Sequence, residues 1–145
     1  LVSMLAAAYA AKGHKVLVVA DRVAFLKNCA TLVGDNAICI TGEVDHEERE
    51  DLLKLVSSGE KDVLFGTKAI FSEGISESSL SCLILGTPIN NEPLLTQLIG
   101  RVIREKPNKL QPRIVDIHLE GNTARRQASN RMGYYIKQGY RIKEL

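Results

Sequence analysis

The 145-residue sequence lacks the two common motifs that hold nucleotide phosphates. No segment follows the pattern G-x-x-x-x-G-K-[ST], and none follows G-x-G-x-x-G. In both motifs a glycine-rich turn brings backbone N–H groups close to phosphate oxygens. If this chain takes part in nucleotide chemistry, another domain must therefore hold the phosphates.

Cysteine is scarce and is not arranged in pairs. The three cysteines stand in apolar runs without a C-x-x-C motif, at Cys29, Cys39 and Cys82. We predict buried thiols in a reducing compartment rather than disulfides or metal ligands. The histidines are also isolated from one another, at His14, His46 and His118, so we expect no metal site.

Apolar runs of transmembrane length are absent as well. The first residues, LVSMLAAAYAAKGHK, resemble the centre of a signal peptide but lack its basic segment. We predict instead an amphipathic helix that ends at Lys12–Gly13. The chain does not begin with Met, which suggests the interior of a longer protein. We expect a cytoplasmic or nucleoid-associated protein, neither secreted nor bound to a membrane.

Charge of both signs is present but unevenly distributed. Residues 1–100 contain 8 Lys and Arg against 13 Asp and Glu, a net charge of −5, whereas residues 101–145 contain 11 against 4, a net charge of +7. A basic final third is typical of a protein that meets a polyanion, either nucleotide phosphates or a nucleic-acid backbone. A solvated basic helix face would produce the same imbalance, and charge alone does not separate the two.

Short β-branched runs alternate with longer periodic stretches, as buried strands alternate with amphipathic helices. We predict strands over Lys15–Ala20, Ala37–Ile40, Asp62–Phe65, Ser81–Leu85 and Arg113–His118, with a last one over Tyr140–Lys143. We predict helices over Arg22–Val33, Asp45–Ser58, Glu92–Arg104 and Asn122–Gln138, and a short helix or a loop over Lys68–Ser72. This order favours an α/β fold with a doubly wound, mainly parallel sheet and helices on both faces.

Polar residues and glycines follow several predicted strands. They are Asp21, Arg22, Thr41, Gly42, Gly66, Thr67 and Lys68, with Gly86-Thr87-Pro88 and Leu119-Glu120-Gly121. Ligands of a doubly wound sheet gather at the carboxyl ends of its strands, so these are the first candidates for a binding site. Asp21 has a second explanation, shared with Asp45, because aspartate is also a favoured N-cap of a helix.

The segment QLIGRVIR, residues 97–104, places one amide and two guanidinium groups on one side of a predicted helix. Gln97, Arg101 and Arg104 are spaced i, i+4 and i+7, which share a helical face. Gly100 removes a side chain beside Arg101 and lets another surface approach. Because arginine pairs bidentately with phosphate oxygens and keeps its charge, this face suits a phosphate chain.

Ordinary ion pairs are the alternative for the two arginines. Acids such as Glu105 or Asp116 could pair with them and only stabilise the fold. The glutamine and glycine at these spacings, directly after a strand and loop of the form LILGTP, favour the phosphate instead.

At this point the sequence resembles a known family. QLIGRVIR is similar to motif VI, Q-x-x-G-R-x-x-R, of superfamily 2 helicases. DVLFGTKAIFSEGIS followed by LSCLILGTP resembles motif V and its following strand, and HKVLVVADRVAFL resembles motif IV. The order and intervals match from about residue 13 to 105, and the tail RRQASNRMGYYIKQGYRI resembles the closing helix and strand. Among superfamily 2 helicases, these motifs look most like those of the RecG-like, type III restriction and phage recombination DNA helicases.

The resemblance implies that residues 1–145 are the second, C-terminal RecA-like domain of an ATP-dependent helicase. Arg104 aligns with the arginine finger of the family, Arg101 with its companion on the γ-phosphate, and Gln97 with a residue that contacts nucleotide or water. ATP would lie in the cleft toward the N-terminal RecA-like domain of the same polypeptide. That domain would hold Mg²⁺ and the phosphate-binding loop, so this chain alone would be inactive.

Motif V would touch both ligands. Thr67 aligns with the threonine that bonds a nucleic-acid phosphate, helped by Gly66 and Lys68. The ATP-facing end of the motif comprises Glu73, Gly74 and Ser76. Many relatives carry aspartate where this sequence has Ser76, and a serine can bond a ribose hydroxyl but brings no charge. A plain polar loop is the alternative for this region.

The strand ends Asp21, Arg22, Thr41 and Gly42 would touch the nucleic acid through its backbone, by the same resemblance. Such binding tolerates any base sequence and weakens with salt. The style of the motifs favours DNA over RNA. Three tyrosines could stack on bases, although packing within the domain is favoured for them: Tyr134, Tyr135 and Tyr140, near Arg131 and Lys137.

Two other functions compete with that of a motor domain. One is a helicase-like module that binds nucleic acid or regulates without productive ATPase activity, which would not need Gln97, Arg101 and Arg104 together. The other is a nucleotide-binding domain unrelated to helicases, which the missing phosphate-binding loop disfavours.

Overall fold

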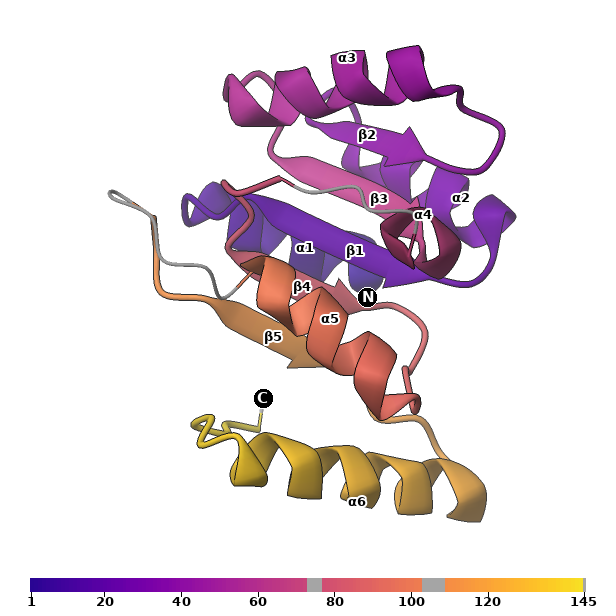
Figure 1. Cartoon of the computed structure of the whole chain (residues 1–145), viewed down its shortest axis with the longest axis vertical. Coiled ribbons are helices and arrows are strands. Elements are labelled where there is room, and N and C mark those ends of the chain that lie inside the picture. The colour runs from indigo at the N-terminus through magenta and orange to yellow at the C-terminus, as the bar shows by residue number, and fades with distance from the viewer. Residues whose placement is uncertain (73–76, 103–108, 145) are drawn as a thin grey trace.

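The computed structural model describes residues 1–72, 77–102 and 109–144. Within them, five parallel strands form one sheet in the order β2-β3-β1-β4-β5 (Figure 1). The strands are β1 (Val16–Ala20), β2 (Ala37–Ile40), β3 (Val63–Thr67), β4 (Cys82–Leu85) and β5 (Arg113–Asp116). The helices are α1 (Val2–Ala11), α2 (Val23–Val33), α3 (His46–Ser57), α4 (Lys68–Ser72), α5 (Glu92–Val102) and α6 (Asn122–Lys137). The predicted α/β class with a doubly wound parallel sheet is confirmed.

The strands pair in a register that aligns their carboxyl ends. Val16 of β1 lies opposite Val63 of β3 and Cys82 of β4, and Ala20 lies opposite Thr67. Every residue of β1 and of β4 is buried, which is the pattern of strands covered on both faces. The residues that follow β1, β3 and β4 therefore meet at one edge of the sheet, which we name the carboxyl edge.

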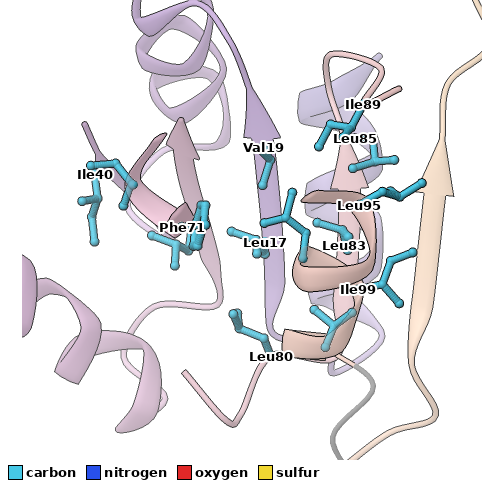
Figure 2. Packing of buried hydrophobic residues seen from close by; sticks show 14 of the residues in the cluster. Leu17, Val19, Ile40, Phe71, Leu80, Leu83, Leu85, Ile89, Leu95 and Ile99 are labelled. Carbon is cyan, nitrogen blue, oxygen red and sulfur yellow. The ribbon is translucent and has the colours of Figure 1, made fainter. Parts of the chain in front are cut away.

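Alternate residues of each strand face opposite layers of helices. In β1, Val16 and Val18 pack in one cluster with α1 and α2, whereas Leu17 and Val19 pack in another with α3, α4, α5 and α6. Figure 1 shows α1 and α2 behind the sheet and α4 and α5 in front of it. Figure 2 shows the front cluster, where α5 packs across β4. This packing fixes the inner side of α5 and leaves its outer side for other contacts.

Strands β1, β4 and β5 match their predictions to within two residues at one end, and two further differences have identifiable reasons. β3 continues through Gly66 to Thr67, beyond the predicted end at Phe65, because β1 and β2 pair with it on both sides. The predicted strand over Tyr140–Lys143 is wrong, since these residues have no regular secondary structure. The Tyr140 ring instead packs on Tyr135 of α6, with 6.4 Å between ring centroids.

The cysteines are free thiols in the structure. Cys29 and Cys82 are buried, as predicted, and Cys39 is partly exposed. Burial raises the pKa of Cys82 to about 12 and also raises the pKa of Cys39. Because the thiolate is the reactive form, neither of these two thiols is a candidate nucleophile.

His14 is buried at the amino end of the sheet, where β1 and β4 begin. Its Nδ1 lies 2.8 Å from the hydroxyl oxygen of Ser81, and its ring meets the Tyr9 ring edge-on. Burial lowers the pKa of His14, and the positive charges of Arg113 and Lys12 lower it further. The folded chain therefore favours the neutral imidazole.

We expect the free energy of unfolding to fall as the pH drops below 6.5, the ordinary pKa of histidine. Below that pH the unfolded chain takes up a proton that the folded chain resists, so acid favours unfolding until the lowered folded pKa is passed. Thermal unfolding at about pH 7.5 and about pH 5.5 measures the difference. His14→Gln should reduce the difference, whereas His46→Gln, at an exposed histidine, should not. An equal difference in wild type and His14→Gln would contradict the assignment.

Candidate functional site

Three strand ends meet at the carboxyl edge. Lys68 Nζ lies 2.9 Å from Asp21 Oδ1, and the backbone N–H of Asp21 donates to the Thr87 hydroxyl over 3.1 Å. These residues follow β3, β1 and β4, and the sheet register brings them together as the sequence predicts. Asp21 is not an N-cap, because Arg22 holds that position of α2. Asp45 is one, since its side chain accepts a bond from the Glu48 N–H of α3.

The other predicted residues of the edge differ in exposure. Arg22 and Gly42 are exposed and Thr67 is partly exposed. Thr41 is only 2% exposed, and its carbonyl accepts the N–H of Val44 in the turn that leads to α3. In this arrangement Thr41 supports the turn, and Gly42 is the residue that presents its backbone to solvent.

Gly66 has a packing role inside β3. A Cβ atom at this position would lie 2.8 Å from Cε2 of Phe71, closer than real Cβ contacts allow. The Phe71 ring can therefore lie over the strand only because residue 66 has no side chain. The sequence predicts a contact between Gly66 and a nucleic-acid phosphate, whereas the structure buries Gly66 beneath Phe71.

Helix α5 presents two contrasting sides, as its sequence predicts. Its buried side consists of Leu95, Leu98, Ile99 and Val102. On the other side Gln97 is exposed and Arg101 is half-buried. Apart from its chain neighbours and the backbone of its own helix, no atom of the described residues lies within 4 Å of the place where a Cβ of Gly100 would be. The exposed amide of Gln97 and the open position at Gly100 thus lie on the outer side of α5, beside the half-buried Arg101.

Arg101 also makes a contact that the sequence did not indicate. Its Nη2 donates to the backbone carbonyl of Phe71, near the end of α4, over 2.9 Å. Asp116, the acid proposed as an alternative partner, accepts bonds from Arg131 and Tyr135 instead. Arg101 therefore joins α5 to α4.

Several predicted residues lie outside the described part of the chain. They are Glu73, Gly74 and Ser76 of motif V, Arg104 of motif VI, and Glu105, the other alternative partner of the arginines.

A buried polar network between β5, α6 and the loop before α5 was not predicted. Arg131 of α6 is 4% exposed and bonds both Asp116 oxygens through Nε and Nη2, at 2.7 and 3.0 Å. Tyr134 and Tyr135 are both buried, which confirms the packing role over base stacking. The sequence feature that could have indicated this network is the spacing of Arg131, Tyr134 and Tyr135, which places them on one helical face.

Residues 1–106 match the family described as the Helicase conserved C-terminal domain. The chain belongs to this family. It is a RecA-like C-terminal domain of superfamily 2 helicases, as the resemblance of motifs IV, V and VI indicates. Among the described residues of this helicase domain, no helix has the length and apolar character needed to cross a bilayer.

Viral helicases are similar to this helicase domain. The probable helicase D10 of Escherichia phage T5 is 40% identical over 140 residues, which cover 94% of this chain and 31% of that protein. The putative ATP-dependent RNA helicase L396 of Acanthamoeba polyphaga mimivirus is 31% identical over 91 residues, covering 62% of this chain and 17% of that protein. The ATP-dependent DNA helicase uvsW of Enterobacteria phage T4 is 26% identical over 109 residues, covering 75% of this chain and 22% of that protein.

The crystal structure of T4 UvsW has the same fold as this helicase domain. The TM-score is 0.80 at 21% identity, and the match covers 99% of this chain and 33% of that chain. The chain spans about a third or less of the length of each of these three proteins.

Proposed function

We propose that this chain is the second motor domain of an ATP-dependent nucleic-acid translocase. It would supply an arginine finger and one half of the nucleic-acid track. An N-terminal RecA-like domain of the same polypeptide would supply the phosphate-binding loop and the Mg²⁺ ligands, because neither phosphate motif is in this sequence.

The outer side of α5 carries this proposal. A glycine inside a helix costs about 1 kcal/mol relative to alanine, and no described neighbour approaches Gly100 closely enough to require one. Under this proposal the glycine makes room for a surface that comes from outside the domain. The exposed amide of Gln97 and the guanidinium of Arg101 beside it have the donors that phosphate oxygens need.

ATP, when bound, supplies the phosphoryl group whose transfer drives the motor. On this side Gln97 and Arg101 would orient the phosphates, and helical spacing in the sequence predicts Arg104 for the same face. Motif V would approach the nucleotide through Glu73, Gly74 and Ser76. Two guanidinium groups facing a polyanion would also explain why the helix places arginines beside its apolar side, where desolvation is expensive.

The carboxyl edge is the proposed track. The side chains of Lys68 and Asp21 are 26% and 51% exposed, and exposed ion pairs contribute only ~0–1 kcal/mol. A backbone phosphate could therefore replace Asp21 beside Lys68 with little loss. Thr67, Arg22 and the backbone of Gly42 lie along the same set of strand ends. Contacts of this kind bind the nucleic-acid backbone whatever its base sequence, and they weaken as the salt concentration rises.

Helix α4 connects the two proposed sites. It begins at Lys68, which pairs with Asp21 at the track, and near its end the Phe71 carbonyl accepts the bond from Arg101. A movement of Arg101 toward the phosphates would shift α4, and this shift would move Lys68 at the proposed nucleic-acid-binding edge. Residues of this domain would thereby couple the nucleotide to the position of the strand.

DNA is the track that we propose. T4 UvsW is a DNA helicase by name and L396 a putative RNA helicase, so the relatives include both kinds. The sequence similarity to uvsW covers 75% of this chain, against 62% for L396, and motifs IV, V and VI resemble those of DNA translocases.

The ATPase activity of the full-length protein tests the proposal. We expect turnover to be stimulated by nucleic acid, and the strongest stimulant among single-stranded, forked and four-way DNA and RNA identifies the track. The 145-residue chain alone should be inactive. A full-length protein that binds nucleic acid but hydrolyses no ATP would replace the motor with a binding or regulatory module.

A further inference from the structure

Helix α6, which begins after the family match ends at residue 106, is tied to the start of α5. Arg131 spans three segments: Nε and Nη2 bond Asp116 at the end of β5, and Nη1 donates to Asn90 Oδ1 over 2.7 Å. Asn90 lies in the loop between β4 and α5. The next residue, Asn91, accepts the N–H of Leu94 through its side chain and so caps α5.

A second bond joins the two helices further along α5. The hydroxyl oxygens of Tyr134 and Thr96 are 2.6 Å apart. Since the Thr96 hydroxyl donates to the Glu92 carbonyl over 2.9 Å, Tyr134 is the donor in this pair. Thr96 directly precedes Gln97. Helix α6 thus bonds Asn90, the residue before the cap of α5, and also Thr96, the residue before Gln97 on the proposed phosphate-binding side.

These hydrogen bonds supply the directional restraint that the apolar contacts of α5 lack. Contacts of Leu95, Leu98 and Ile99 with the sheet are non-directional and tolerate a small rotation of the helix about its axis. Hydrogen bonds at two points restrict such a rotation, because their geometry is narrow. A misplacement of about 1 Å at a reacting group can lower a rate by about 10²-fold.

We propose that Arg131 is a positioning residue of the motor. Through Asn90, and together with the Tyr134–Thr96 bond, it sets the orientation in which α5 presents Gln97 and Arg101. This inference rests on the proposed function. The Arg131–Asp116 pair attaches α6 to the sheet. The bonds of Arg131 to Asn90 and of Tyr134 to Thr96 then keep α5, and with it the proposed phosphate site, in a fixed orientation relative to the sheet.

The double variant Asn90→Ala/Thr96→Val removes the bonds of Arg131 to the loop before α5 and of Tyr134 to α5, and it retains the buried Arg131–Asp116 pair. In the full-length protein we expect kcat of nucleic-acid-stimulated ATP hydrolysis to fall about tenfold or more, with little change in KM, and amide hydrogen exchange in α5 to accelerate. Asn90→Asp/Thr96→Ser keeps an acceptor and a hydroxyl and should restore both. Tyr135→Phe is the matched control, because it removes a bond to Asp116 without touching α5.

Three results would overturn the inference: an unchanged kcat in the double variant of an active enzyme, unchanged exchange in α5, or an equal loss of kcat in Tyr135→Phe. The last would mean that general stability of the network, not the orientation of α5, controls turnover. If exchange accelerates only in the double variant while the wild-type protein hydrolyses no ATP, the proposed function fails. The tie between α6 and α5 then stands, and its role in a motor is refuted.

Discussion

Arg104→Ala in the full-length protein is expected to lower nucleic-acid-stimulated ATP turnover by about 10³-fold or more. An arginine finger stabilises charge that develops on the transferred phosphoryl group, so its loss raises the barrier of the chemical step far more than it weakens ground-state binding. ATP binding should therefore persist. Steady-state turnover, together with a fluorescent-nucleotide titration, measures the two effects separately.

Arg126→Ala is the matched control for Arg104→Ala. It removes an arginine from an exposed position of α6 and should leave turnover unchanged. If Arg104→Ala also turns over ATP at the wild-type rate, Arg104 has a structural role and the finger is misassigned. A large loss of ATP binding would likewise contradict a role confined to the transition state.

Arg101→Lys is expected to lower stimulated turnover by about 10²-fold, the usual effect of removing one fixed donor to a developing charge. Lysine keeps the charge but not the planar fork of arginine. It could not bind a phosphate, as proposed for Arg101, and at the same time keep the bond that Arg101 donates to the Phe71 carbonyl. The stimulation by nucleic acid should fall more than the basal rate, because the link from α5 through α4 to Lys68 is lost. The ratio of turnover with and without nucleic acid measures that coupling.

Arg126→Lys makes the same exchange on the exposed surface and should leave the ratio unchanged. The coupling through α4 is refuted if Arg101→Lys lowers basal and stimulated turnover by the same factor. In that case Arg101 acts on the nucleotide alone, and its bond to Phe71 only stabilises α4.

Much of the carboxyl edge was predictable because parallel strands share a direction. Once the strands were recognised as parallel, Asp21, Lys68 and Thr87 were expected at the same end of the sheet. The strand order β3-β1-β4, which makes them neighbours, came only from the structure. Burial at this edge was not predictable. Thr41 is 2% exposed and Gly66 is covered by the Phe71 ring, and the residue types beside these two positions in the sequence do not indicate either burial.

The sequence by itself determined the sheet and the two sides of α5. Apolar runs and helical spacing are local properties, so the strands of the sheet and the common face of Gln97 and Arg101 follow from periodicity alone. The tertiary structure alone decided the partners of the guanidinium groups. Arg101 bonds Phe71 across 30 positions and Arg131 bonds Asn90 across 41. Many carbonyls and acids could satisfy an arginine, and only the packing of α4, α5 and α6 on one face of the sheet selects among them.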